Sequence, residues 1–242
     1  MVVAFLALAT AVPLAQEPST TAAALLKDPA VAAALRSARA GEPGTIGDQI
    51  RFCEVPAPPF GESARAVVLT RAFLDLGLRN VRTDAAGNVL GERPGTAGRP
   101  HLVVAAHLDT VFPEGTDVRV RRDGPILRGP GIGDNCRGLA VLVAIARALA
   151  EAKVETPGPI TFVANVGEEG LGDLRGVKAL FGATLKGRID RFVSIDNAGL
   201  HITHRAVGSR RYRVTFAGPG GHSYGAFGLP NPIGALGRAA AR

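Results

Sequence analysis

The chain has 242 residues, of which 28 are basic and 21 acidic, for a formal net charge of +7, and 46% of them are hydrophobic. This composition is typical of a globular protein and excludes collagen, coiled coils and disulfide scaffolds. No apolar run reaches the roughly 18 residues that a membrane-spanning helix needs, so no membrane span is predicted. The basic residues are mostly scattered arginines, and only 5% of the residues are aromatic. Because nucleic-acid modules concentrate charge and supply stacking rings, no nucleic-acid partner is predicted.

The N-terminus carries a short apolar run, VVAFLALATAVPLA at residues 2–15, followed by the polar stretch QEPSTT. It resembles the hydrophobic region of a secretory signal, although no Lys or Arg precedes it. We therefore interpret residues 1–16 as a signal peptide, which predicts a periplasmic or secreted protein. The alternative is a frayed apolar helix on a cytoplasmic protein. In an oxidising compartment Cys53 and Cys136 could pair, although free thiols fit the sequence equally well.

Helical patterns dominate the next part of the chain. An Ala-rich helix is predicted over residues 21–39, with a break near Pro29. A second helix is predicted over 61–78, because its apolar residues recur at spacings of three and four. The residues of that apolar face are Ala64, Val68, Leu69, Ala72, Phe73 and Leu76. Two short strands around a turn at 86–88 are predicted within residues 80–92.

Three short runs rich in Val, Ile or Phe follow, at residues 101–106, 160–166 and 191–195. Each is too short for a helix and is predicted to be a buried strand. Helical patterns at 135–150 and 173–185 separate them. Alternating strands and helices predict an α/β fold, with a mixed, largely parallel central sheet and helices on both faces.

The pattern changes after Asn197. Residues 208–217 alternate polar and apolar side chains, which predicts a half-exposed antiparallel strand. A Gly-rich turn and an apolar helix over residues 230–242 come next. We therefore predict a first domain over residues 17–204 and the start of a second, α+β domain over 205–242.

Residues of the types that bind metals stand where the predicted strands end. The carboxyl ends of parallel strands are where ligands bind in open α/β sheets. A lone histidine, an acidic pair or a helix-capping aspartate has an ordinary structural explanation, but all of these side chains are predicted to converge. They are His107 and Asp109 after the first run, Glu168 and Glu169 after the second, Asp196 after the third, and Asp134 at the start of a helix.

Carboxylates and an imidazole in one cleft repel one another unless a cation lies among them. Mixed ligands of this kind favour zinc, with cobalt or manganese as alternatives. The spacing His107-x-Asp109 suits an aspartate that orients the imidazole. Glu168 and Glu169 are adjacent and cannot both point at one ion, so one can bind metal while the other reaches a water molecule. A metal lowers the pKa of that water from about 15.7 to about 7, and a carboxylate takes its proton.

Five segments together resemble the M20 family of metallopeptidases: HLDTVFPEG, GPGIGDNCRG, NVGEEGLGDLRG, SIDNAG and GPGGHSYG, in family order over about residues 45–242. The resemblance implies a zinc-exopeptidase fold and a pair of zinc ions. His107 and Asp196 would hold one ion, Glu169 would help hold the other, and Asp134 would bridge them. Glu168 would be the general base, and Asp109 would orient His107. The implied reaction is hydrolysis of an amide or peptide bond in a short peptide or N-acyl amino acid.

The resemblance also extends to the second domain. His222 resembles the lid-domain histidine that reaches the partner's active site in family dimers, so a lid and dimerisation domain and a homodimer are implied. An exposed strand at 210–217 would be a candidate edge for that contact. None of the five histidines matches the family's remaining histidine ligand, which implies that the chain ends before it.

Two rival interpretations stay open. The first is a non-catalytic binding protein or inactive fragment of the same fold that lacks the last metal ligand. The second is a nucleotide-binding oxidoreductase that uses the glycine loop at residues 129–133, although the G-x-G-x-G spacing departs from the dinucleotide-binding pattern.

Overall fold

A computed structural model describes residues 18–197, 199, 201–205, 208 and 212–241. The chain divides into two compact units, Met1–Gly199 and Leu200–Arg242. The predicted signal peptide, residues 1–16, lies outside the described residues. In the part of the chain that is described, no helix combines the length and the apolar character needed to cross a membrane.

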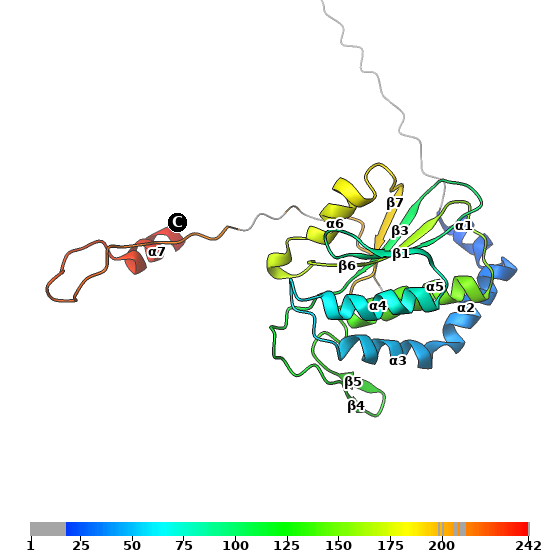
Figure 1. Cartoon of the computed structure of the whole chain (residues 1–242), viewed down its shortest axis with the longest axis horizontal. Helices are drawn as coiled ribbons and strands as arrows, with labels where there is room; N and C mark the ends of the chain where they lie inside the picture. The colour runs from blue at the N-terminus through cyan, green and yellow to red at the C-terminus, as the bar shows by residue number, and fades with distance from the viewer. Residues whose placement is uncertain (1–17, 198, 200, 206–207, 209–211, 242) are drawn as a thin grey trace, which may run out of the picture. The chain divides into compact units, whose positions relative to one another are not determined.

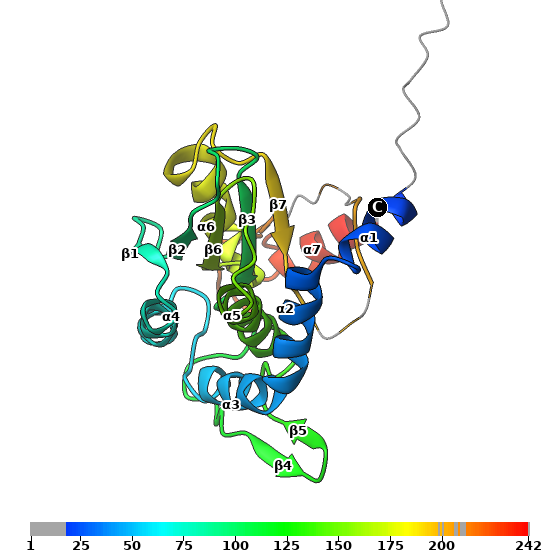
Figure 2. The ribbon, with the colours of Figure 1, turned by 90° about the vertical axis from the view of Figure 1, so that its right-hand side faces the viewer.

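The first unit, shown in Figure 1, is built on a five-stranded sheet in the order β1-β2-β6-β3-β7, which can be followed in Figure 2. Its strands are β1 (Arg79–Thr83), β2 (Val89–Arg93), β3 (Leu102–His107), β6 (Ile160–Asn165) and β7 (Arg191–Ser194). β3 runs parallel to both β6 and β7, whereas β2 is antiparallel to both β1 and β6. The sheet is therefore mixed with parallel central strands, as predicted. The register places His107 opposite Asn165, so β3 and β6 end at the same level.

Helices cover both faces of this sheet. The helices of this unit are α1 (Pro18–Leu25), α2 (Pro29–Ala40), α3 (Glu42–Cys53), α4 (Ser63–Asp75), α5 (Cys136–Glu151) and α6 (Arg175–Ala179), which continues into the π-helical turn η2 (Leu180–Thr184). Successive residues of β3 point to opposite faces. Val104 and Ala106 pack with α4 and α5, whereas Val103 and Ala105 pack against η2. Figure 2 looks along α5, with α2 and α3 beside it.

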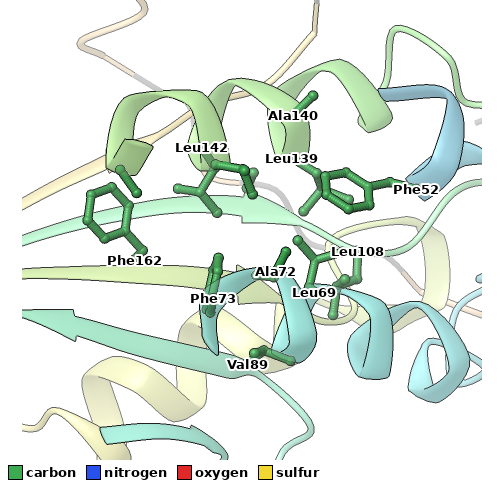
Figure 3. Close-up of a cluster of buried hydrophobic side chains, with 14 of the residues drawn as sticks. Phe52, Leu69, Ala72, Phe73, Val89, Leu108, Leu139, Ala140, Leu142 and Phe162 are labelled. Carbon is green, nitrogen blue, oxygen red and sulfur yellow. The ribbon is translucent and has the colours of Figure 1, made fainter. Parts of the chain in front are cut away.

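The larger core cluster lies between the sheet and helices α3, α4 and α5 (Figure 3). Phe73 of α4, Leu142 of α5 and Phe162 of β6 are fully buried in it. The helix predicted over residues 135–150 is confirmed as α5. Its apolar side chains face the core, because Leu139, Leu142, Val143 and Ala146 are buried and Leu149 packs against the cluster. Truncating one such phenylalanine to alanine typically costs about 3–5 kcal/mol.

The face of α4 differs from the prediction at one position. Ala64 is exposed, and Arg65 is buried in its place. The Arg65 guanidinium is accommodated because it donates to three backbone carbonyls, those of Val55, Leu108 and Cys53. A buried cation is tolerated when its donors are satisfied in this way.

β7 is a strand as predicted, but it is not buried. In the described part of the chain it pairs with β3 alone, at the edge of the sheet, and Arg191, Val193 and Ser194 are exposed. Helix α3 and the hairpin of β4 (Arg121–Asp123) and β5 (Ile126–Arg128) were not predicted. Helix α3 contains two glycines, which weaken its helical pattern, and each hairpin strand is only three residues long. The sequence pattern therefore did not predict these elements.

The second unit contains α7 (Pro232–Ala240), which confirms the helix predicted over 230–242. The Asn231 side chain caps it by accepting the backbone N–H of Ile233 at 2.9 Å. The strand predicted over 208–217 is not found: residues 209–211 lie outside the described residues, and 208 and 212–217 have no regular structure. A strand needs a pairing partner, and the described residues of this unit form no other strand with which it could pair.

Candidate metal centre

The structure brings six of the seven predicted site residues together where β3, β6 and β7 end: five candidate ligands, and Asp109 beside them. Ligand atoms of His107, Asp134 and Asp196 lie within 4.8 Å of one another, as do those of His107, Glu168 and Glu169. His107 ends β3, the two glutamates follow β6, Asp196 follows β7 and Asp134 precedes α5. His107 is therefore common to two overlapping groups of candidate ligands.

The tautomer of His107 is set by its surroundings. The ring is buried, and Nδ1 lies 2.9 Å from the backbone carbonyl oxygen of Asp109. A carbonyl can only accept, so Nδ1 carries the proton and donates it. Nε2 lies 3.0 Å from Asp134 Oδ1 and 3.5 Å from Asp196 Oδ1. Neither Nε2 nor Asp134 Oδ1 has a hydrogen-bond partner among the described residues, although both atoms are buried.

This donor set fits a divalent cation. Burial alone would lower the pKa of His107, but the carboxylates of Asp109 and Asp196 outweigh it and raise the pKa to about 10. Burial, with the neighbouring carboxylates, raises the pKa of Glu168 and of Glu169. Without a cation the cluster therefore tends to hold protons. A metal ion facing Nε2 and the carboxylate oxygens would take the place of those protons, and imidazole with carboxylate oxygens suits zinc and similar ions.

Asp109 contacts both His107 and the turn that carries the two glutamates. Its backbone carbonyl orients the His107 ring, whereas its carboxylate oxygen stands 3.7 Å from Nδ1, beyond hydrogen-bond distance. The carboxylate instead accepts the backbone N–H groups of Glu168 at 3.1 Å and Glu169 at 2.8 Å. Burial would raise the pKa of Asp109, but His107 and these two N–H groups lower it. The fully buried carboxylate thus fixes the turn that presents both glutamates.

The segments that carry Asp134 and Asp196 are tied to each other. Asn135 donates from Nδ2 to the carbonyl of Ile195 at 2.9 Å, next to Asp196. The glycine loop before Asp134 packs tightly, because a Cβ on Gly131, whose φ is +73°, would overlap the Thr110 side chain. This loop follows β5 of the separate hairpin. A dinucleotide loop follows a strand of the central sheet, so the oxidoreductase interpretation lacks its structural context.

The remaining candidates are placed elsewhere. His222 belongs to the second unit, where Nδ1 accepts the backbone N–H groups of Tyr224 and Gly225 at 3.3 Å. Cys53 and Cys136 are buried free thiols, and Cys53 donates to the carbonyl of Pro130 at 3.2 Å. Cys53 and Cys136 therefore form no disulfide in this structure.

Several residues that hold the site were not found from the sequence. Asn88 and Glu62 accept the backbone N–H groups of the two residues just before the glutamates, and Arg175 donates to Glu62. No motif marks Glu62 or Asn88, and Glu62 has the sequence signature of an ordinary acidic residue at a helix start. Arg175 lies within the segment NVGEEGLGDLRG, but that segment gave it no role. These contacts can be found only in the folded structure, because the residues that form them lie far apart in the sequence.

Sequence similarity relates this chain to known peptidases. Residues 103–226, just over half of the chain, match the model of peptidase family M20/M25/M40. Carboxypeptidase G2 of Pseudomonas sp. (strain RS-16) is 32% identical over 116 residues, which are 45% of this chain and 28% of that protein. The chain thus spans less than a third of this curated relative.

Solved structures share the fold at low sequence identity. A tripeptidase from Staphylococcus aureus subsp. aureus Mu50 has a TM-score of 0.53 and 24% identity, over 64% of this chain and 43% of that one. The di-peptidase Dug1p from Saccharomyces cerevisiae has a TM-score of 0.62 and 14% identity, over 87% and 52%. The Bacillus subtilis YXEP protein, described as a dinuclear metal binding peptidase from the M20 family, has a TM-score of 0.52 and 16% identity, over 66% and 44%. With the family match over half of its residues, the chain belongs to peptidase family M20/M25/M40.

Proposed function

We propose that the protein is a metal-dependent hydrolase that cleaves an amide or peptide bond in a short peptide or N-acyl amino acid. The observation that carries this proposal is the position of His107, whose unpaired Nε2 faces the carboxylates of Asp134 and Asp196. Glu168 and Glu169 lie within 4.8 Å of the same imidazole. The tripeptidase and di-peptidase with this fold support peptides as the substrate class.

The ligands divide between two sites in this proposal. His107, Asp134 and Asp196 would hold one ion, and Glu169 with the shared Asp134 would contribute to a second. Zinc is the expected ion, with cobalt or manganese as alternatives. When bound, the metal polarises the scissile carbonyl and lowers the pKa of a water molecule.

Glu168 is the proposed general base. Burial and the neighbouring carboxylates raise its pKa. A raised pKa suits a carboxylate that acts as a general base near neutral pH. A Glu168 carboxylate oxygen would take a proton from the attacking water as the water oxygen bonds to the carbonyl carbon. The same oxygen would return the proton to the amine nitrogen as the C–N bond breaks. Asp109 keeps the backbone of this residue in place.

The domain assignment belongs to the same proposal. Residues 17–204 would supply the N-terminal part of the catalytic domain, and residues 205–242, with His222, would begin a lid and dimerisation domain. The observed division into units Met1–Gly199 and Leu200–Arg242 is compatible with that arrangement.

A substrate panel tests the proposal. The complete protein, supplied with zinc, would be incubated with dipeptides, tripeptides and N-acetyl amino acids, with Glu168→Gln as the matched control. We expect hydrolysis that a chelator abolishes and added zinc restores. Tight zinc binding without hydrolysis of any of these substrates would favour the non-catalytic alternative instead.

A further inference from the structure

The segment that presents the two glutamates is held by side chains from other parts of the chain. Four consecutive backbone N–H groups, those of residues 166–169, each donate to a buried or partly buried side-chain oxygen. The pairs are Val166 to Asn88 at 3.0 Å, Gly167 to Glu62 at 3.1 Å, Glu168 to Asp109 at 3.1 Å and Glu169 to Asp109 at 2.8 Å. The shape of this segment therefore depends on acceptors outside it.

Glu62 has a second partner. The oxygen Oε1 that accepts from Gly167 also accepts from Arg175 Nη2 at 2.7 Å, and the Glu62 side chain is only 4% exposed. The Arg175 guanidinium in turn lies over the ring of Phe60, 4.6 Å from its centroid. Glu62 thus joins the start of α4 to both ends of the segment between β6 and α6.

The backbone of this segment is irregular. Its φ angles are positive at Gly167, Gly170, Asp173 and Leu174. A Cβ on Gly167 would overlap the Arg175 guanidinium, so the arginine packs directly on the glutamate-bearing turn. Apart from the 3₁₀ turn at Gly170–Gly172, the segment has no helix or strand. A backbone with such φ angles keeps one shape only if the surrounding contacts impose it.

We propose that the pair formed by buried Glu62 and partly buried Arg175 is a positioning device that fixes Glu168 and Glu169 relative to His107. This inference rests on the proposed function for the roles of the two glutamates. Glu62 touches neither metal ligand atoms nor substrate and acts through the Gly167 N–H. Loss of its charge weakens the hydrogen bond to this N–H and leaves the Arg175 cation without its counter-charge, so the turn relaxes and both glutamates shift.

Two variants of the complete protein test the proposal. Glu62→Gln keeps the size of the side chain and removes its charge. Glu62→Gln combined with Arg175→Met also removes the partly buried cation that Glu62→Gln leaves unpaired, and so carries the test if the single variant does not fold. The matched control is Glu92→Gln, which breaks the Arg82–Glu92 pair, joined at 2.9 Å between β1 and β2. Zinc affinity by chelator competition, kcat, KM and the thermal midpoint would be measured for each.

For both test variants we expect zinc affinity to fall about 10-fold to 100-fold, because residues that support ligands have effects of this size. We expect kcat to fall by a similar factor with KM changed less than about 3-fold, since a small misplacement of a reacting group acts on turnover. The control should leave zinc affinity and kcat unchanged. A lower thermal midpoint with wild-type zinc affinity and kcat would mean a merely structural pair and would overturn the proposal. A wild-type protein without activity would refute the proposed function instead, and zinc affinity would then decide the positioning role.

Discussion

The Asp109 carboxylate accepts two consecutive backbone N–H groups, so Asp109→Asn should loosen the turn that carries the proposed base. One oxygen accepts from Glu168 at 3.1 Å and the other from Glu169 at 2.8 Å. Asparagine offers one carbonyl oxygen and one NH₂ group. One of the two backbone donors would therefore face another donor inside the protein.

The magnitude follows from the burial of Asp109, which is completely inaccessible to solvent. A hydrogen bond to a charged group contributes about 1.5–3 kcal/mol, and an unsatisfied buried donor costs about 1–3 kcal/mol. We expect Asp109→Asn to lower the free energy of unfolding by about 2–4 kcal/mol, because one bond is lost and the other becomes neutral. Displacement of Glu168 should also lower kcat by about 10²-fold.

The pH dependence has a defined sign. Burial opposes ionisation of Asp109, but His107 and the two backbone N–H groups outweigh it and lower its pKa in the folded protein. A carboxyl group of this kind stabilises the fold above its unfolded pKa of about 3.9, and the contribution is lost as the pH falls through the folded pKa. The stability difference between wild type and Asp109→Asn should therefore be constant from about pH 5 to 7 and shrink below about pH 4.

Urea unfolding of the metal-free proteins at pH 7 and at acidic pH measures both effects. Asp117→Asn is the matched control, because Asp117 is an exposed aspartate that bonds only to its neighbour Arg119 in the described structure. Its unfolding midpoint should match that of the wild type. The reasoning is refuted if Asp109→Asn unfolds with the wild-type free energy, or if the difference grows in acid.

Three further outcomes are expected of the complete protein. Glu168→Gln should keep its metal and lower kcat by at least about 10²-fold, measured by steady-state kinetics with metal analysis, and near-normal turnover would remove Glu168 as the base. Glu169→Gln should instead lose metal, because it removes a ligand, and an unchanged metal content would contradict that role. The protein should dimerise through the region that includes residues 210–217, and a monomeric mass by light scattering at micromolar concentration would exclude it.

The parts of the fold that could be predicted are those whose signal is local. β3 and β6 are continuous apolar runs because both of their faces are covered, and α5 has an uninterrupted helical face. The approach of His107, Asp134 and Asp196 could be expected as well, since His107 ends β3, Asp134 precedes α5 and Asp196 follows β7, which was also predicted as a strand. The order of parallel strands then places them at one edge.

The parts that could not be predicted depend on contacts between distant segments. Glu62 meets Gly167 across 105 residues and Arg175 across 113, and no spacing in the chain records either contact. Helix α3 contains Gly44 and Gly47, which weaken its local preference, and packing of its buried Phe52 on the core overrides them. Burial of Arg65 likewise depends on carbonyls of other segments.

Retention of zinc by residues 1–242 tests the metal centre most directly. After loading and dialysis, the chain should keep about one ion, because His107, Asp134 and Asp196 give the three protein ligands of an ordinary catalytic zinc site. The second group, with Glu169 and the shared Asp134, has no imidazole of its own and should bind more weakly. Asp196→Asn should abolish tight retention. A wild-type chain that keeps no zinc, or an Asp196→Asn chain that keeps as much as the wild type, would contradict the site.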